Sequence, residues 1–272
     1  MSRYVKESNE ALLMVVASTL GSEETKEDYR KRREEERKET LRGKKLHGAF
    51  LEGIKGVADE RTWQWLRAGY LAKSTETFVF AAQEQALRTR FTRSKVDGEE
   101  IETCCRVCEE QIETIPHIVS GCNVLAQTRY KTRHDKMGLR VYWELCRKYG
   151  IECSEKWYRE IPDEVRYTGD RGVEIWWNRR ILTTVQLEHN QPDVVVLDHS
   201  AKECTIIDFA VPWDKNVVKK EDEKLERYLP LAREMTRLYG MKAKVVPIVV
   251  GGLGTIPKRL AKFIKQLDYC KV

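Results

Sequence analysis

The sequence has 272 residues, of which 41% are hydrophobic and 34% are charged, and its formal net charge is +6. This composition is typical of a globular protein of more than one domain, and the positive charge favours an acidic partner such as nucleic acid. A transmembrane protein is excluded because no run of residues reaches the roughly 18 apolar positions that span a bilayer, so we expect no membrane partner.

The first part of the chain is expected to be helical. Residues 23–46 contain ten Lys or Arg and eight Asp or Glu, and opposite charges at i,i+4 predict a solvated helical connector. From Ala49 to Arg93 apolar residues recur at helical spacing, which predicts two or three further helices. We assign residues 1–98 to this charge-rich helical region. A basic edge at its end either contacts a phosphate backbone or is ordinary surface charge. That edge consists of Arg88, Arg90, Arg93 and Lys95.

The four cysteines between Cys104 and Cys122 form a metal-ligand pattern. Cys105-Arg-Val-Cys108 is followed by His117 after eight residues and by Cys122 after four more. Zn²⁺ takes four tetrahedral sulfur or nitrogen ligands, and two short ligand pairs joined by a loop supply them. We predict a structural zinc site, since four protein ligands leave no open position for catalysis. Two alternatives remain: Cys104 in place of Cys105, or buried free cysteines beside an unrelated histidine.

The other four cysteines are scattered, which fits a reducing compartment better than a disulfide scaffold. We therefore expect an intracellular protein. The stretch after the zinc motif has five cations and one acid, Asp135, so nucleic-acid contact is expected there. The cations are Arg129, Lys131, Arg133, Lys136 and Arg140. Residues 99–140 form the predicted CCHC zinc knuckle with its basic helix.

Residues 141–272 have the pattern of an α/β domain. Gly240 is placed to end a helix over Lys220–Tyr239, and Pro230 should kink that helix. Pro257 is placed to begin the helix that follows. Pro247 indicates that the strand over Ala243–Val250 lies at a sheet edge or carries a bulge. The predicted elements are a helix over Leu139–Tyr149, a strand over Val173–Ile181, a hairpin of Val194–Leu197 and Cys204–Val211, a helix over Lys220–Tyr239, a strand over Ala243–Val250 and a helix over Pro257–Leu267.

The hairpin is expected to bring two carboxylates together. Pro192-Asp193 opens the run Val194–Leu197, and Asp208 lies fifteen positions after Asp193. A turn midway between the two runs sets Asp193 opposite Asp208, with Cβ atoms roughly 5 Å apart. Such like charges repel unless they share a proton or bind a cation, and Mg²⁺ takes carboxylate oxygens and bridges to phosphate. In the alternative interpretation Asp193 caps the strand entrance and Asp208 is a satisfied core carboxylate.

Cleavage of a phosphodiester also requires a cation near the metal. Lys224 is the first choice because it lies one turn before Tyr228 on the same helical face. Lys220 and Lys219 are the alternatives.

Other groups near these elements have both a functional and a structural interpretation. Glu174 or Glu188 would complete the metal site. Trp176-Trp177 either stack on bases or pack in the core, and we favour packing. The segment Gly251-Gly252-Leu253-Gly254 lacks the spacing of a phosphate-binding loop and is expected to be a flexible turn.

The order of these features resembles the C-terminal region of non-LTR retrotransposon polyproteins that carry a restriction-like endonuclease. The shared features are the knuckle Cys-x2-Cys-x8-His-x4-Cys, then Pro-Asp, fourteen residues, Asp, and a following Lys/Tyr helix. The segments over residues 81–89, 117–120 and 208–212 also resemble that region. The resemblance covers the chain from about Thr40 to the end.

The resemblance implies a PD-(D/E)xK-like nuclease that nicks target DNA so that a reverse transcriptase can prime on the exposed 3′ end. Asp193 and Asp208 would be the ligands of Mg²⁺ or Mn²⁺, Lys224 the displaced lysine and Tyr228 its companion. Position 210, where an ordinary nuclease of this superfamily has its lysine, is Ala, so the assignment of Lys224 depends on the displaced arrangement.

The chain contains no adjacent Asp-Asp pair, so the paired aspartates of a reverse transcriptase centre are absent. The resemblance therefore implies a nuclease region without polymerase activity. Its expected partners are DNA, RNA and a reverse transcriptase, and its expected location is the nucleus, with the cytoplasm as the alternative.

We therefore expect an α/β protein with a helical N-terminal part, a small zinc knuckle and a PD-(D/E)xK restriction-endonuclease-like mixed sheet flanked by helices. The expected function is metal-dependent DNA cleavage with structural Zn²⁺ and catalytic Mg²⁺ or Mn²⁺. The alternatives are a nucleic-acid-binding remnant that no longer cuts and a purely structural protein.

Overall fold

A five-stranded mixed sheet with strand order β1-β2-β3-β4-β5 forms the centre of the protein. The computed structural model describes residues 25–69 and 71–267. β1 to β4 pair antiparallel in chain order, and β5 pairs parallel with β4. The predicted α/β class with a mixed sheet is confirmed. The strands span Val165–Tyr167 (β1), Val173–Trp177 (β2), Val194–Asp198 (β3), Glu203–Ala210 (β4) and Lys242–Val249 (β5).

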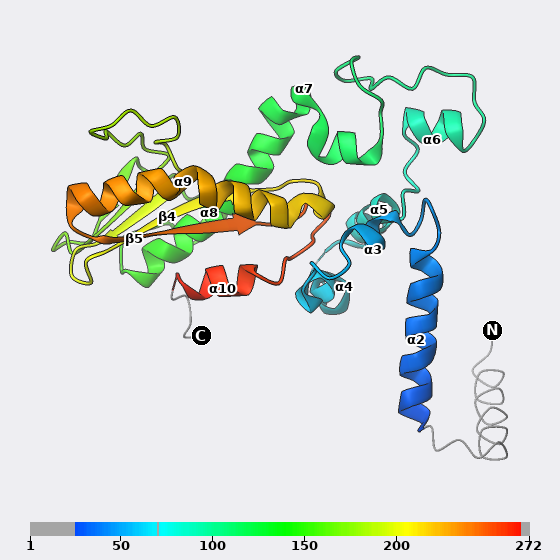
Figure 1. Cartoon of the computed structure of the whole chain (residues 1–272), viewed down its shortest axis with the longest axis horizontal. Coiled ribbons are helices and arrows are strands. Elements are labelled where there is room, and N and C mark those ends of the chain that lie inside the picture. Colours follow the sequence, from blue (N-terminus) through cyan, green and yellow to red (C-terminus); the bar gives the residue numbers. More distant parts are fainter. Residues whose placement is uncertain (1–24, 70, 268–272) are drawn as a thin grey trace.

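Helices cover both faces of this sheet (Figure 1). The crossover helix α9 (Val217–Tyr239) lies on one face, where Leu231 and Met235 pack against Val195 and Ile206. The opposite face is covered by α8 (Lys131–Lys148) and α10 (Leu260–Lys265). Because successive strand residues point to opposite faces, the continuous apolar runs of β3 and β4 fill both cores.

The β3–β4 hairpin has the predicted register. Val195 pairs with Ile206, and Leu197 pairs with Cys204. At the open end of the hairpin the last pair is Val194 with Ile207. Asp193 and Asp208 are the next residues outward, so the register places them at the same end of the sheet.

Two strand predictions differ from the structure. β1 was not expected, because three residues in a turn-rich segment give no detectable alternation. β2 ends at Trp177 and not at Ile181, because Asn178 has a left-handed φ of 47° and its N–H donates to Asp193 O at 2.7 Å. β5 lies at the sheet edge, as Pro247 predicted.

The two late helices also differ slightly from their predicted bounds. α9 begins three residues earlier than predicted, contains Pro230, and ends at Gly240, whose φ of 62° is left-handed as expected. α10 begins at Leu260 and not at Pro257. The reason is that Pro257 pairs with Ala58 and the next N–H, from Lys258, donates to Val57 O at 3.0 Å.

The part of the chain before α8 is helical, with short elements. α2 is a charged helix that begins at a capping box formed by Thr25 and Asp28, and none of its described residues is buried. Phe50 of α3 and Ala82 of α5 belong to a small core that also contains Leu253, so these two helices contact the loop after β5. α8 runs through the predicted domain boundary at residue 140. These helices are α2 (Lys26–Arg42), α3 (Ala49–Gly53), α4 (Gln64–Ala68), α5 (Lys73–Gln83), α6 (Arg90–Lys95) and α7 (Asn123–Leu125).

Among residues 25–69 and 71–267, no helix has the length and apolarity required to cross a membrane.

Candidate functional site

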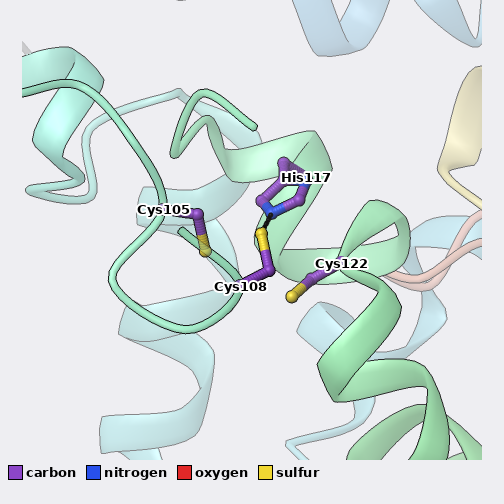
Figure 2. A group of neighbouring side chains, drawn as sticks. All are labelled: Cys105, Cys108, His117 and Cys122. Atoms are coloured by element: carbon purple, nitrogen blue, oxygen red, sulfur yellow. Dashed lines mark hydrogen bonds between the residues drawn. The ribbon is translucent and has the colours of Figure 1, made fainter. Parts of the chain in front are cut away.

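The predicted zinc ligands lie together. The ligand atoms of Cys105, Cys108, His117 and Cys122 are all within 4.8 Å of one another. Figure 2 shows the Cys108 sulfur directed at the His117 ring, with the Cys105 and Cys122 sulfurs beside them. The Cys108 Sγ to His117 Nε2 distance is 3.4 Å, close to the roughly 3.5 Å expected between a sulfur and a nitrogen on one tetrahedral Zn²⁺. This Cys₃His cluster can hold a metal ion and is compatible with structural zinc.

The structure also distinguishes Cys105 from Cys104. Cys105 is fully buried in the cluster, whereas Cys104 is exposed and pairs with Ile112 in an isolated bridge. Burial raises the pKa of the Cys105 thiol, and the backbone N–H of Glu110 lowers the pKa of Cys108. The geometry therefore favours Cys105 as the ligand.

Contacts around the cluster hold its ligands in position. Gln111 Oε1 lies 3.1 Å from His117 Nδ1, which leaves the other ring nitrogen directed at the cluster. The Tyr130 hydroxyl accepts from Cys122 N at 3.2 Å and donates to Ile118 O at 2.7 Å. Tyr130 thus connects the last ligand to the segment that leads into α8.

Arg133 joins the cluster region to the end of β4. Its Nη2 donates to Val119 O at 3.0 Å and to Val211 O at 3.3 Å. Its surroundings are apolar enough that burial lowers the pKa of this guanidinium. Arg133 therefore forms a bridge within the protein.

The two predicted carboxylates are held by different elements. Asp193 lies just before β3, and its Oδ2 accepts the N–H of Phe209 in β4 at 2.7 Å. Asp208 lies in β4 and is only 2% exposed. Burial, followed by repulsion from Asp193, raises the pKa of Asp208. Asp193 binds the N–H of the residue that follows Asp208, so the two carboxylates lie at the same end of the hairpin.

Lys224 and Tyr228 reach Asp208 from α9. Lys224 Nζ forms an ion pair with Asp208 Oδ2. The Tyr228 hydroxyl donates to Gln191 O at 3.3 Å, and burial followed by the Asp208 charge raises the pKa of Tyr228. The helical spacing predicted from the sequence thus places both side chains at the carboxylate.

His134 in α8 was not predicted from the sequence, yet it lies at this centre. Its Nε2 is 3.2 Å from Asp193 Oδ2 and 3.2 Å from Phe209 O, and its Nδ1 is 3.1 Å from Asp135 Oδ1. The hydrogen bond to Asp193 raises the pKa of His134 to about 9. The only sequence signal was a His-Asp pair in a basic helix. Such a pair does not reveal which strand the helix contacts.

These contacts alter the argument that buried carboxylates require a metal. In the absence of an ion, Lys224 is the charge partner of Asp208, and protonated His134 is the partner of Asp193. A divalent ion is therefore one of two ways to neutralise this pair.

A basic groove leads to the carboxylates. It has a volume of about 1370 Å³ and is bordered by the Cys₃His cluster, the first turns of α8 and α9, and the end of β4. Asp193 and His134 both line it. Its cations outnumber the acids Asp135, Asp193 and Glu223. The lysines that line it are Lys131, Lys136, Lys215, Lys219, Lys220 and Lys224.

The alternative metal ligands lie elsewhere. Glu174 pairs with Leu197, toward the other end of β3 from Asp193, and its carboxylate contacts His199 Nε2 at 3.2 Å. Glu188 is exposed and lies 3.7 Å from His189. Trp176 is buried, and Trp177 packs edge-on against Tyr142 at 5.3 Å between ring centroids, which agrees with the packing interpretation.

The basic edge before the cluster is largely engaged within the chain. Arg88 and Arg93 each contact Glu99 at 2.5 Å. Arg90 donates to Cys104 O at 3.1 Å. These contacts favour a structural role for the three arginines.

The glycine loop after β5 binds a carboxylate of the protein itself. Asp214 is fully buried and accepts the N–H groups of Leu253 at 3.0 Å and Thr255 at 3.1 Å. A Cβ at Gly251 would lie 2.1 Å from Asp214 Oδ1, so this position requires glycine. Because Asp214 takes these donors, the loop is a structural turn.

Comparison with protein families and with curated proteins finds no match to this chain.

Proposed function

We propose that this protein is a metal-dependent DNA endonuclease of retrotransposon origin, in which a restriction-like PD-(D/E)xK sheet supplies the catalytic centre. In this proposal it nicks target DNA to prime reverse transcription. RNA and a reverse transcriptase are further partners, and the nucleus is its place of action, with the cytoplasm as the alternative.

One observation carries the proposal. Asp193, from the residue before β3, lies with Asp208 of β4 and Lys224 of α9 beside a groove whose lining is rich in lysine. A cationic groove attracts a polyanion and orients its phosphates. Carboxylates at such a place would repel a phosphate unless a cation lies between them.

The donor set fits Mg²⁺ or Mn²⁺. Two carboxylates and the nearby Phe209 carbonyl are hard oxygen donors of the kind that both ions prefer. Asp193 lines the groove, so an ion and a phosphate can reach it from solvent. When bound, such an ion supplies Lewis acidity and lowers the pKa of its water.

Lys224 and Tyr228 have distinct roles in this proposal. Lys224 touches Asp208 and lines the groove, so its ammonium can hold a water or stabilise charge on a phosphate oxygen. Tyr228 is buried beside Asp208 and fixes the position of α9 through Gln191 O. The lysine that position 210 lacks is thereby supplied from the helix, and Pro230 does not prevent it.

The Cys₃His cluster is proposed to be a CCHC zinc knuckle that borders the DNA path. His117, Gly121 and the basic first turns of α8 all line the same groove. A bound zinc would stabilise that wall without taking part in cleavage, because its four protein ligands leave no open position.

The test is conversion of supercoiled plasmid to nicked circles by the purified chain in Mg²⁺ or Mn²⁺. We expect nicking that stops in EDTA, returns when Mg²⁺ is added in excess, and is lost in Asp208→Ala. Nicking that persists in EDTA, or in folded Asp208→Ala, would contradict the proposal.

The second candidate is a nucleic-acid-binding remnant that no longer cuts. The observation favouring it is that His134 and Lys224 neutralise both carboxylates without a metal ion. This function predicts salt-dependent DNA binding by a folded, zinc-loaded chain that does not nick plasmid in any divalent ion.

A further inference from the structure

The position of His134 is not explained by the two-carboxylate centre alone. Its side chain comes from α8, on the opposite side of the sheet from α9, and its Nε2 points between two oxygen atoms. These are Asp193 Oδ2 and Phe209 O, each 3.2 Å away. Both are acceptors, so Nε2 faces them as a donor in the ion-free protein, and a divalent ion could take the place of its proton.

We infer that His134 is a further protein ligand of the divalent ion proposed for this centre, joining Asp193, Asp208 and the Phe209 carbonyl. The inference rests on the proposed metal-dependent function. It assigns a nitrogen donor to a centre that otherwise contains only oxygen donors.

The separations between the donor atoms support this assignment. Ligands at right angles on an octahedral ion with bonds of about 2.1 Å lie roughly 3.0 Å apart. The two 3.2 Å distances from His134 Nε2 are close to that value. Each separation therefore allows one ion to contact His134 Nε2 together with the neighbouring oxygen.

Asp135 supplies the outer contact that a metal-binding histidine requires. Its Oδ1 lies 3.1 Å from His134 Nδ1, so Nδ1 would keep its proton when Nε2 exchanges its own proton for an ion. A histidine that bonds to a carboxylate on one side and faces carboxylate and carbonyl oxygens on the other is the usual carboxylate–histidine–metal arrangement.

A nitrogen ligand should alter which ion binds best. Mg²⁺ strongly prefers oxygen donors, whereas first-row transition ions take imidazole more readily. The centre should therefore favour Mn²⁺ over Mg²⁺ more strongly than a carboxylate pair would. Removing the imidazole should reduce this preference.

The competing account is that His134 is only an imidazolium that pairs with Asp193. It would then leave the centre, or remain outside the ligand set, when an ion binds. The two accounts differ in whether a histidine nitrogen is bonded to the ion.

The experiment is pulsed electron paramagnetic resonance of Mn²⁺ bound to the zinc-loaded full chain, without DNA. We expect modulation from a directly bonded ¹⁴N in the wild type, replaced by ¹⁵N coupling when histidine is ¹⁵N-labelled. The coupling should be lost in His134→Ala and retained in His199→Ala, a matched control whose ring contacts Glu174.

Calorimetric titration provides a readout independent of the spectrum. His134→Ala should weaken Mn²⁺ binding more than Mg²⁺ binding, and Asp135→Asn should weaken Mn²⁺ binding by about tenfold. If His134→Ala does not fold, the labelled wild type alone decides the question.

The outcomes separate this inference from the proposed function. Mn²⁺ binding that Asp193→Asn abolishes, but that shows no nitrogen coupling, overturns the His134 assignment and leaves the nuclease proposal standing. The absence of any Asp193-dependent Mn²⁺ binding overturns both.

Discussion

Glu221 is a buried acid in the first half of α9. Its carboxylate is fully buried, and its cationic partner is Arg259, with Nε 3.6 Å from Oε2. Burial raises the pKa of Glu221 to about 7. The folded protein thus keeps this proton to a higher pH than the unfolded chain, whose Glu titrates near about 4.3. Ionisation of Glu221 therefore destabilises the fold as pH rises through this window.

We predict that Glu221→Gln stabilises the protein at pH 8 and has little effect at pH 5. The gain at pH 8 follows from the pKa shift of the wild-type residue to about 7, which corresponds to at most about 4 kcal/mol. Urea unfolding at both pH values measures it. An unchanged difference between the two proteins at pH 5 and pH 8 would contradict the argument.

The residues around the Asp193–Asp208 carboxylate pair differ in how well the sequence predicts them. Asp193 and Asp208 could be paired in advance because hairpin register follows from alternation and turn position. Lys224 and Tyr228 followed from helical spacing. His134 could not be predicted, because it reaches Asp193 from α8, and the contact depends on how that helix packs on the sheet.

At the scale of elements, α8 packs tightly against the sheet at Gly138. A Cβ at this position would lie 3.0 Å from the Phe209 ring and 3.1 Å from the Trp177 ring. The small residue therefore lets α8 bring His134 to the end of β4. This contact depends on two aromatic side chains that lie far along the chain.

We predict that Gly138→Leu destabilises the fold by roughly 1–3 kcal/mol, because the added side chain overpacks this contact. Lys136→Leu, at an exposed position of the same helix, should change stability by less than about 0.5 kcal/mol. Thermal unfolding of both variants measures the difference. Equal stabilities would show that α8 does not need this close approach.

The elements also show where sequence patterns fail. β3, β4, α9 and β5 were predicted within a few residues, since their apolar periodicity is strong. β1 is too short for alternation to be visible. The start of α10 was placed three residues early because Pro257 instead pairs with Ala58, a contact that no local pattern indicates.

For the whole molecule, hydrogen bonds of Arg133 connect the Cys₃His cluster to the strand end that carries the carboxylate centre. Arg133 bonds to Val119 O beside the cluster and to Val211 O just after β4. Metal bound at the cluster should therefore stabilise the end of β4 as well as its own loop.

We predict that zinc-specific chelation increases amide exchange over residues 117–133 and 209–213, with less change over the paired residues 195–206. Arg133→Leu should confine the increase to the first segment, whereas Arg129→Leu, at an exposed position, should behave as the wild type. Hydrogen–deuterium exchange by mass spectrometry measures all three. Full protection of residues 209–213 after metal loss would refute the connection.

The central claim is that Asp193 and Asp208 form a working metal centre for DNA cleavage. The most direct measurement compares plasmid nicking by Asp208→Asn with nicking by Asp198→Asn, which alters a carboxylate at the far end of the same hairpin. In saturating Mg²⁺ and excess protein, Asp208→Asn should slow nicking by at least about 100-fold. Asp198→Asn should stay within about twofold of the wild type. Equal rates for the two variants would contradict the account.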